Sequence, residues 1–322
     1  MCTAIRDRDL FGRTLDLECS YGETVTVTPR AYPLRFLLEP PMEQHFAMIG
    51  MAHVEDGVPL YYDAVSEAGL AIAALNFPIS AAYLPPRAGA HNVASFELIP
   101  WLLGQCRTLS DAITLLRDTN IIPDRFRDHL PASPLHWLIA DRHGAAAIEP
   151  MPDGLIIHDN PFGVLANEPP FPYHATRAAD FSHVSAEPPE NHLCPTVMLT
   201  PYSRGMGGIG LPGDFSSSSR FIRALFAKTH TVHKTPPEEI SRFFHVMDTV
   251  SQPSGTAVTD NGVPIATVYT SCADLSTASY YFTTYGCRRI RAVHLRPEDA
   301  AGDRLITYPI DSSSGEDVAW VN

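Results

Sequence analysis

The second residue of the chain is a cysteine that directly follows Met1. Because cysteine is small, an aminopeptidase that removes methionine would expose Cys2 as the new first residue. Such a cysteine carries a nucleophile and a base on one residue: its α-amine titrates near ~7.7–8.0 and its thiol near ~8.5, so a proton passes between them at little cost at neutral pH. Thiolate is the attacking species, and a nearby cation would raise its population. A Met-Cys start alone is more often incidental than catalytic, so the surrounding residues decide.

Three more familiar patterns do not apply to this chain. Residues 205–210 match G-x-G-x-x-G, but Pro212 and Gly213 follow where a dinucleotide-binding fold needs a helix, so a flexible glycine loop is the better interpretation. His230 and His233 lie near an expected helix end, but a catalytic metal needs three protein ligands in fixed geometry. There is no G-x-S-x-G and hence no sign of a serine nucleophile elbow. We expect neither a metal nor another cofactor.

Composition and charge exclude several classes of protein. The chain has 322 residues, of which 45% are hydrophobic, so it can bury a full core and is not a disordered chain. The net charge of −13 argues against nucleic acid as a partner, because nucleic-acid binding requires a positive surface. No apolar run approaches the ~18 residues of a membrane span, and the longest, 69–75, is typical of a buried strand. We therefore expect neither nucleic acid nor a membrane as a partner.

The first residues and the cysteines predict a cytoplasmic protein. The charged run 6–9 stands where a signal peptide would have an apolar core, so we expect no signal peptide. The six cysteines form no CxxC pairs, which argues against a zinc ribbon and against a disulfide framework.

Most of the chain is expected to form strands. Residues 24–28 alternate Thr and Val, the pattern of a half-buried strand. Turn residues separate the apolar runs 135–140, 145–148 and 155–158, which predicts an antiparallel meander. A second group of strands is expected near the C-terminus, at 266–271, 279–285, 290–295 and 305–310. Runs of strands interrupted by helices predict an α+β protein with antiparallel sheets.

Three helices and one long loop complete this outline. Ser110 is expected to cap a helix that begins at Asp111, and serines 216–219 precede another. A third helix carries apolar residues at helical spacing, namely Ile240, Phe243, Phe244 and Met247. The proline-rich segment 181–201 has no periodicity, which predicts a long excursion of the kind that is usually functional or interfacial.

Several short segments around Cys2 occur together in an order that is similar to one known family. They are Cys2-Thr3-Ala4, Phe11-Gly12-Arg13-Thr14-Leu15-Asp16, Ala74-Leu75-Asn76-Phe77-Pro78, Leu165-Ala166-Asn167-Glu168-Pro169, and Leu211-Pro212-Gly213-Asp214 with Ser219-Arg220-Phe221. This set resembles the choloylglycine hydrolase family, which comprises bile salt hydrolases and penicillin V acylases. Leu135-His136-Trp137 and Tyr269-Thr270-Ser271-Cys272 look similar as well. Each segment is weak alone, but five in order over nearly the whole chain are highly specific.

The resemblance implies the N-terminal nucleophile (Ntn) hydrolase fold, an αββα sandwich of two antiparallel sheets between helical layers. This agrees with the α+β class expected from the strand and helix patterns, and it implies a single domain over residues 1–322. Carried over by motif, Cys2 would be the nucleophile and its own α-amine the general base. Arg13 resembles the family's arginine beside the sulfur, where its fixed positive charge would favour thiolate. Asp16 would accept hydrogen bonds from the α-amine and orient it.

The same resemblance assigns three further catalytic residues. Asn76 and Asn167 match the asparagines at the oxyanion, where preorganised donors typically contribute ~3–4 kcal/mol. Arg220 matches a second arginine that stabilises charge in the transition state. Without the resemblance, the asparagines would be read as turn residues and Arg13 with Asp16 as a surface ion pair.

Spacing raises one question about these assignments. If 11–16 is one straight strand, Arg13 and Asp16 point to opposite faces, so both would reach Cys2 only if the chain turns after Leu15. The chain also departs from many relatives by carrying Pro170 where they have threonine. This puts in doubt any hydrogen bond from a threonine hydroxyl at that position.

The implied activity is hydrolysis of the amide in glycine- or taurine-conjugated bile acids. A steroid acid requires a wide, mostly apolar pocket. Its expected walls are the loop 121–134 together with Leu15, Phe77, Ile79, Tyr83 and Leu84, although each could equally be ordinary packing.

Two features bear on the subgroup and the assembly. Asn76 looks like the bile salt side of the family, since penicillin V acylases tend to carry tyrosine there. Ser203 and Arg204 belong to a loop that resembles a variant associated with taurine. The excursion 181–201 resembles the family's assembly loop, which implies a homotetramer, with a solvated surface loop as the alternative. The other hypotheses are an acylase for penicillin V, for other N-acyl amides or for acyl-homoserine lactones, and a catalytically silent binding protein.

Overall fold

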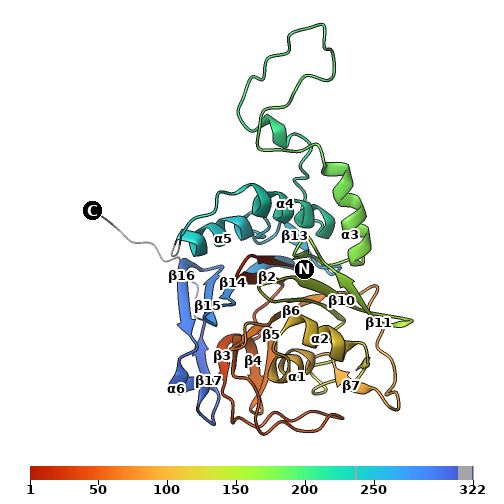
Figure 1. Cartoon of the computed structure of the whole chain (residues 1–322), viewed down its shortest axis with the longest axis vertical. Coiled ribbons are helices and arrows are strands. Elements are labelled where there is room, and N and C mark those ends of the chain that lie inside the picture. The colour runs from red at the N-terminus through yellow and green to blue at the C-terminus, as the bar shows by residue number, and fades with distance from the viewer. Residues whose placement is uncertain (236–237, 311–320, 322) are drawn as a thin grey trace.

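Two antiparallel β-sheets face each other between two layers of helices (Figure 1). The structure is a computed structural model that describes residues 1–235, 238–310 and 321. The single domain expected over 1–322 therefore includes positions that lie outside the described residues. Within them, the order of layers is helix, sheet, sheet, helix, which confirms the predicted sandwich.

The first sheet, sheet A, contains the first two strands of the chain. Its order is β12-β1-β2-β14-β15-β16, with β13 paired to β14, and all these pairs are antiparallel. The bounds are β1 Cys2–Asp7, β2 Leu10–Leu17, β12 Val164–Leu165, β13 Ala257–Val258, β14 Pro264–Asp274, β15 Ser279–Thr284 and β16 Cys287–His294. Cys2 thus lies at the start of a strand that is paired on both sides.

The second sheet, sheet B, is built mainly from the first half of the chain. Its order is β11-β10-β9-β6-β5-β4-β3-β17. The bounds are β3 Thr24–Thr28, β4 Met48–Glu55, β5 Val58–Ser66, β6 Ala71–Asn76, β9 Leu135–Ala140, β10 Ala145–Met151, β11 Gly154–Asp159 and β17 Ile306–Pro309. A separate parallel pair joins β7 (His91–Ala94) to β8 (Thr119–Ile122).

The helices bury apolar faces against the outer sides of the sheets. Two of them, α4 (Ser217–His230) and α5 (Glu238–Asp248), cover sheet A, with α3 (Phe171–Arg177) beside them (Figure 1). Sheet B is covered by α1 (Leu98–Gln105) and α2 (Leu109–Leu116). The remaining short helices are η1 (Ala178–Phe181), η2 (Met206–Gly208) and α6 (Pro297–Ala300).

Two apolar cores hold these layers together. One lies between the sheets and continues beneath α4 and α5, where Phe221, Phe243 and Met247 are fully buried. The other fills the space between sheet B and α1, around Trp101 and Trp137. Burial of each such large side chain contributes roughly 1.5–3 kcal/mol, so the sheets around Cys2 form a rigid frame.

The structure confirms the meander and the C-terminal strands and corrects two details. The helix expected to begin at Asp111 with Ser110 as its cap begins at Leu109 instead, because Thr108 accepts a hydrogen bond from the Asp111 backbone N–H and Asp111 accepts one in return. This reciprocal pair is a capping box. The chain also continues straight through β2 past Leu15, so the turn considered there is absent from this strand.

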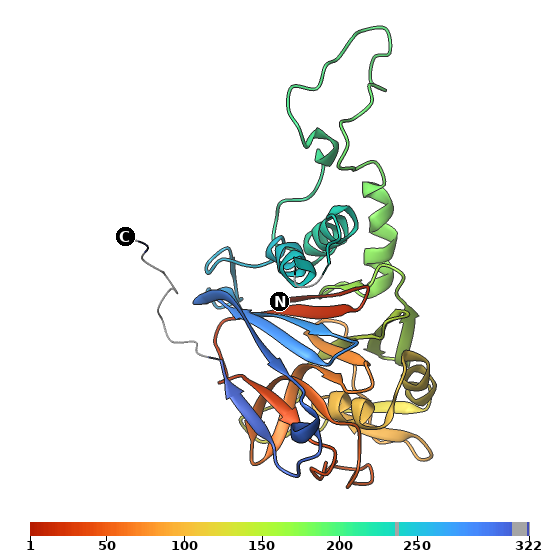
Figure 2. The same cartoon turned by 60° about the vertical axis from the view of Figure 1, so that its left-hand side comes forward.

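A long excursion leaves the compact body between α3 and α4 (Figures 1 and 2). It runs from residue 182 to residue 216, and its regular structure is limited to the short helix η2. The segment predicted as a loop, 181–201, is therefore the first part of a longer excursion that also contains the glycine pattern 205–210. None of the helices in the described part of the chain has the length and apolarity needed to cross a membrane.

Candidate active site

Cys2 and Arg13 meet because their strands are neighbours. The β1–β2 register pairs Cys2 with Leu15 and Ala4 with Arg13, so these side chains share one face of sheet A. That face is turned toward sheet B, and both Cys2 and Arg13 are buried there. The Arg13 Nη2 donates a hydrogen bond to the Cys2 Sγ at 2.5 Å. The guanidinium is thus in direct contact with the sulfur.

Backbone carbonyls hold the rest of the Arg13 guanidinium. Its Nη1 donates to the carbonyl of Tyr62 at 3.3 Å and to that of Ala74, and its Nε donates to that of Thr14 at 3.1 Å. Burial would lower the pKa of Arg13, but attraction to Cys2 and to nearby acidic groups outweighs it and raises that pKa. Arg13 is therefore a permanent, fixed cation beside the sulfur, as the sequence predicted.

Asp16 lies on the opposite face of β2, toward the helices. Its Oδ1 accepts from the Thr267 hydroxyl at 2.6 Å, and its Oδ2 accepts from Gln252 Nε2 at 2.9 Å. A bulge in β14 between Thr267 and Tyr269 lets these two residues face opposite sides of the sheet. Arg13 and Asp16 can therefore both lie near Cys2 although β2 does not turn. The Cys2 side chain points to the face of sheet A that carries Arg13, and the Cys2 backbone is accessible from the opposite face, which carries Asp16.

Asn167 and Arg220 surround the backbone of Cys2. The Asn167 Oδ1 accepts from the Cys2 backbone N–H at 2.6 Å and from Arg220 Nη2 at 2.7 Å. The Arg220 Nη1 donates to the Cys2 carbonyl at 2.5 Å and lies 4.0 Å from Asp16 Oδ2. Burial lowers the pKa of Arg220, against the attraction of Asp16 and Cys2. Both predicted arginines thus reach Cys2, one from each face of sheet A.

Asn76 is linked to this group through its backbone. It ends β6, and its carbonyl accepts from Asn167 Nδ2 at 2.7 Å. The structure therefore brings together all six side chains or backbones predicted to be catalytic, on β1, β2, β6, α4 and the segment after β12. The Asn167 side chain is the hub, since it contacts Cys2, Arg220 and Asn76 at once.

A buried carboxylate that sequence reasoning missed lies next to Arg13. Asp63 on β5 accepts hydrogen bonds from the hydroxyls of Tyr269 at 2.5 Å, Tyr280 at 2.7 Å and Ser271 at 2.9 Å. Burial raises the pKa of Asp63, while Arg13 and the three hydroxyl donors act in the opposite direction. Ser271 belongs to the segment 269–272, which resembles a family motif, and its hydroxyl links sheet A to Asp63 in sheet B.

A second missed network supports Asn167 from behind. The buried Glu149 Oε1 lies 3.2 Å from His136 Nδ1 and accepts from the Phe171 backbone N–H at 2.8 Å. The His174 Nε2 donates to the Asn167 carbonyl at 2.9 Å, and burial lowers the pKa of His174. These contacts fix the segment that carries Asn167. Only the His136 motif gave any hint of them in the sequence.

The expected substrate walls lie at different depths. Leu15 shares the inter-sheet face with Cys2, and the Phe77 ring is buried and stacks on His136 with centroids 4.2 Å apart. Tyr83 and Leu84 are half-buried and contact the loop 121–134: Tyr83 Oη donates to the Ser133 carbonyl at 2.5 Å, and the Leu84 N–H donates to the Ile121 carbonyl at 3.0 Å. Ile79 is 85% exposed. All of these residues except Leu15 follow Asn76 directly in the chain.

Ser203 and Arg204 lie elsewhere. Both are exposed in the excursion, just before η2, and the Ser203 hydroxyl donates to the Arg204 carbonyl at 3.1 Å. Because the excursion rises away from the body in both views, the structure does not bring these two residues to Cys2 within one chain (Figure 2).

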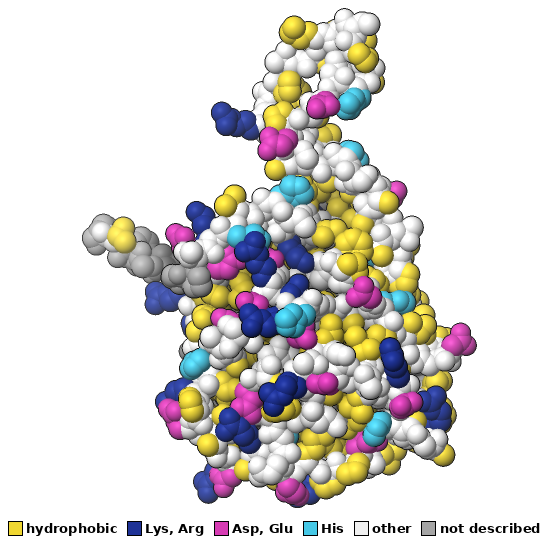
Figure 3. All heavy atoms as spheres, viewed as in Figure 1, with side chains coloured by type: hydrophobic (Ala, Val, Ile, Leu, Met, Phe, Trp, Pro, Cys, Tyr) yellow, Lys and Arg dark blue, Asp and Glu magenta, His cyan; other side chains and the backbone are white. Residues whose placement is uncertain are grey.

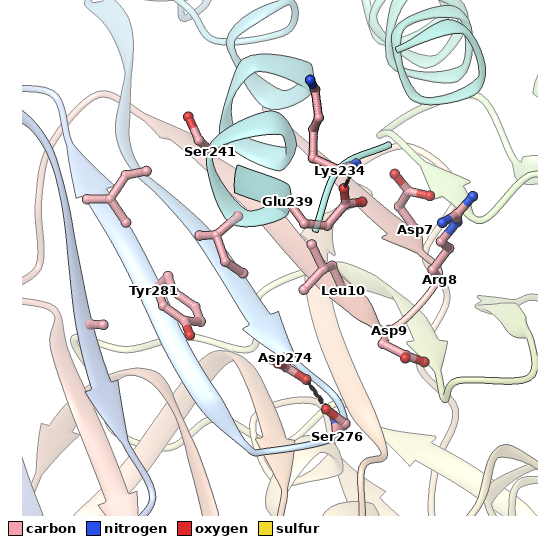
Figure 4. Close-up of a pocket in the computed structure, with 13 residues that line it drawn as sticks. Asp7, Arg8, Asp9, Leu10, Lys234, Glu239, Ser241, Asp274, Ser276 and Tyr281 are labelled. Carbon is pink, nitrogen blue, oxygen red and sulfur yellow. Dashed lines mark hydrogen bonds between the residues drawn. The ribbon is translucent and has the colours of Figure 1, made fainter. Parts of the chain in front are cut away.

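A cavity of about 540 Å³ lies apart from this group, between the β1–β2 turn, α5 and strands β14 to β16 (Figure 4). Among the described residues that line it there is none of the six predicted catalytic ones. At its edge, ligand atoms of Asp7, His233 and Glu239 lie within 4.8 Å of one another. Arg242 Nη2 forms ion pairs with both carboxylates, at 2.7 Å from Glu239 Oε1, and so supplies the positive charge that a metal would bring. The group is an ion-pair network that ties α5 to β1.

The class of enzyme follows from a match to one known family. The profile of the choloylglycine hydrolase family, described as linear amide C–N hydrolases, matches residues 2–308. The chain belongs to the choloylglycine hydrolase family, as the motifs around Cys2 predicted, and it is a linear amide C–N hydrolase.

Individual relatives match over nearly their whole length. The chain is 42% identical over 318 residues to a protein of Lactiplantibacillus plantarum named bile salt hydrolase/transferase, with 98% of each chain covered. It is 33% identical to a protein of the same name from Bifidobacterium longum, over 95% of this chain and 99% of the relative. A mutant conjugated bile acid hydrolase from Clostridium perfringens superposes with a TM-score of 0.90 at 28% identity, with both chains fully covered. Penicillin V acylase from Agrobacterium tumefaciens shares the fold, with a TM-score of 0.74 at 18% identity over 95% and 90% of the two chains.

Proposed function

We propose that this chain is a conjugated bile salt hydrolase whose nucleophile is the thiolate of Cys2. The observation that carries the proposal is the contact between Arg13 Nη2 and Cys2 Sγ, because a buried cation at 2.5 Å favours thiolate. The names of the relatives support the substrate. We also propose a cytoplasmic location, which the unpaired thiols of Cys2, Cys19, Cys106, Cys194 and Cys272 favour.

The reaction proceeds through a thioester. Once Met1 is removed, the Cys2 sulfur attacks the amide carbonyl, and the Cys2 α-amine carries the thiol proton to the leaving nitrogen. Glycine or taurine leaves as the C–N bond breaks. Water then attacks the thioester, the amine accepts its proton, and the free bile acid leaves with the thiol restored. Asp16 orients the amine through its place on the helix-facing side of β2.

Preorganised donors stabilise the oxyanion that forms at each step. Asn167 supplies one of them through the second N–H of its Nδ2, since the first donates to the Asn76 carbonyl and the Oδ1 accepts from Cys2 and Arg220. Asn76 ends β6 on the same side and supplies a second donor. Such donors typically contribute about 3–4 kcal/mol each to the transition state. Arg220 adds a fixed positive charge in a buried setting, where charges act strongly.

The apolar acyl group lies beside Leu15 and against Ile79, Tyr83 and Leu84, together with the loop 121–134. Phe77 supports this wall from beneath, since its ring is buried and stacks on His136. Ser203 and Arg204 lie exposed in the excursion, so their predicted role at a taurine group requires a neighbouring chain of the proposed assembly to bring them to the substrate.

A three-substrate assay tests the proposed function. We expect the purified chain, with its mature N-terminus confirmed by mass spectrometry, to cleave taurocholate and glycocholate with kcat/KM at least about tenfold above that for penicillin V, a difference of about 1.4 kcal/mol in the transition state. Heat-denatured protein is the blank. Faster cleavage of penicillin V would make the chain an acylase of another substrate class, and cleavage of none of the three would contradict the proposal.

We further propose a homotetramer assembled through the excursion. Several apolar side chains of the excursion are exposed to solvent in the single chain (Figure 3): Leu193 at 89%, Met198 at 92% and Tyr202 at 87%. Large exposed apolar groups gathered on one segment are typical of an interface.

Light scattering during size exclusion tests this assembly. We expect a mass of about four chains of 35.3 kDa each for the unchanged protein, and a smaller species for the double variant Leu193→Glu and Met198→Glu. The matched control is Val321→Glu, at another exposed apolar position. A monomer for the unchanged protein would refute the tetramer.

A further inference from the structure

The carboxylate of Glu168, the neighbour of Asn167, collects three hydrogen bonds from one short turn. Its Oε1 accepts from the backbone N–H groups of Ile79 at 2.8 Å and Ser80 at 2.7 Å. Its Oε2 accepts from the Ser80 hydroxyl at 2.8 Å. Hydrogen bonds to an ionised acceptor are among the strong ones in proteins. Glu168 therefore clamps a turn that is almost ninety residues away in the chain.

The clamped turn begins directly after the catalytic region. Asn76 ends β6, and its carbonyl accepts from Asn167 Nδ2 at 2.7 Å. The two segments 76–80 and 167–168 are thus joined twice, once by Asn167 and once by Glu168. The Asn167 link holds the end of the first segment at Asn76, and the Glu168 link holds the end at Ile79 and Ser80.

The turn holds an apolar side chain out in solvent. Ile79 is 85% exposed although it is a large aliphatic residue, while its neighbour Phe77 is fully buried. A single exposed apolar residue is ordinary on a protein surface. Here, however, two backbone hydrogen bonds and one from the Ser80 hydroxyl fix the turn that presents it, two residues beyond the buried Phe77 ring. Such a fixed apolar group is suited to contact an apolar ligand.

The second half of the same loop is held independently of Glu168. Tyr83 Oη donates to the Ser133 carbonyl at 2.5 Å and accepts from the Leu135 N–H at 2.8 Å. Leu84 is fixed to Ile121 by a backbone hydrogen bond of 3.0 Å. Loss of the Glu168 carboxylate should therefore loosen the turn around Ile79 and leave the Tyr83 end of the loop in place.

We propose that Glu168 is a positioning residue that sets specificity for the acyl group. By fixing the turn, it holds Ile79 against the apolar part of a bulky acyl group while Asn167 acts at the carbonyl. The inference rests on the proposed function, because it needs an amide substrate at Cys2. It predicts that the clamp matters for a steroid acyl group and does not matter for an acyl group too small to reach Ile79.

Two substrates with the same leaving group test the clamp. They are glycocholate, with a steroid acyl group, and N-acetylglycine, with a two-carbon one. Glu168→Ala should lower kcat/KM for glycocholate by about tenfold, mainly through KM, and change that for N-acetylglycine by less than about twofold. Glu168→Gln should stay within about twofold of the unchanged protein for both, because the amide oxygen still accepts from the turn. The matched control is Glu298→Ala, an exposed glutamate on α6.

A double-mutant cycle separates action through Ile79 from a general loss of structure. Ile79→Ala should weaken glycocholate cleavage about as much as Glu168→Ala does, and the double variant should be little worse than either single one. Additive effects, or an equal loss on both substrates, would overturn the clamp while leaving the proposed function intact. If the unchanged protein cleaves neither glycine amide, the proposed function itself fails.

Discussion

Replacing Cys2 by alanine is expected to lower kcat/KM for glycocholate or taurocholate by about four orders of magnitude or more. The thiolate sulfur forms the bond to the acyl group, and it is the Cys2 sulfur that Arg13 contacts, while Asn167 and Arg220 hold the Cys2 backbone. The change removes one buried atom, so the fold should persist. Release of glycine or taurine measures the rate, and circular dichroism with thermal unfolding verifies the fold.

Cys19→Ala is the matched control for this experiment. Cys19 is another free cysteine, but it is exposed at the end of β2 and should be replaceable without loss of rate. A folded Cys2→Ala protein that still cleaved the amide would place the nucleophile elsewhere. If neither the unchanged protein nor Cys2→Ala released glycine or taurine, and both bound bile salts, the chain would be a binding protein of the same fold.

Two buried arginines lie around Cys2, and each has an acidic side chain nearby. The net charge of the whole chain, −13, therefore says little about the charge at this site. Arg13, on the inter-sheet face, lies near the Asp63 carboxylate, and Arg220, on the helix-facing side, lies 4.0 Å from Asp16 Oδ2. Each cation is thus offset by a buried acid on its own side of sheet A. Isolated buried charges are costly, so the nearby acid offsets part of the cost of burying each arginine, whatever the net charge of the chain.

Local sequence patterns predicted the parts of the structure that depend on near neighbours. The strands from 135 to 158 followed from apolar runs between turn residues, and their bounds agree closely with β9, β10 and β11. The candidate catalytic residues followed from the resemblance of short motifs to one family, since Cys2, Arg13 and Asn167 each stand within such a segment. The motifs did not predict which strands and helices bring these segments together in space.

The missed residues depend on contacts between distant strands. Asp63 on β5 bonds to Tyr269, Ser271 and Tyr280 on β14 and β15, more than 200 residues later, and nothing local in the sequence marks them as partners. The same holds for Glu168 and its turn. The apparent conflict between Arg13 and Asp16 also disappeared only in three dimensions, because Cys2 is approached from both faces of sheet A.

Blocking removal of the residue before Cys2 is expected to lower kcat/KM by about three orders of magnitude, within the range that a positioned general base contributes. With Met1 in place, the Cys2 nitrogen is an amide that donates to Asn167 Oδ1, so it has no lone pair available to accept the thiol proton. Met1 fits the strand well: its carbonyl accepts from the Asp16 N–H at 2.9 Å. An extended chain should therefore fold normally and lack only the base.

A releasable extension makes this prediction testable within one sample. The variant carries, in place of Met1, a polyhistidine tag and a factor Xa site that ends directly before Cys2. Before cleavage it should be inactive yet should unfold at the same temperature as the mature protein; after cleavage, confirmed by mass spectrometry, its rate should return. The matched control is the same tag at the C-terminus, after residue 322. Full activity of the intact N-terminal extension would show that the thiol proton reaches the leaving nitrogen by another route, with Arg13 and Asn167 acting on a cysteine that has no free amine.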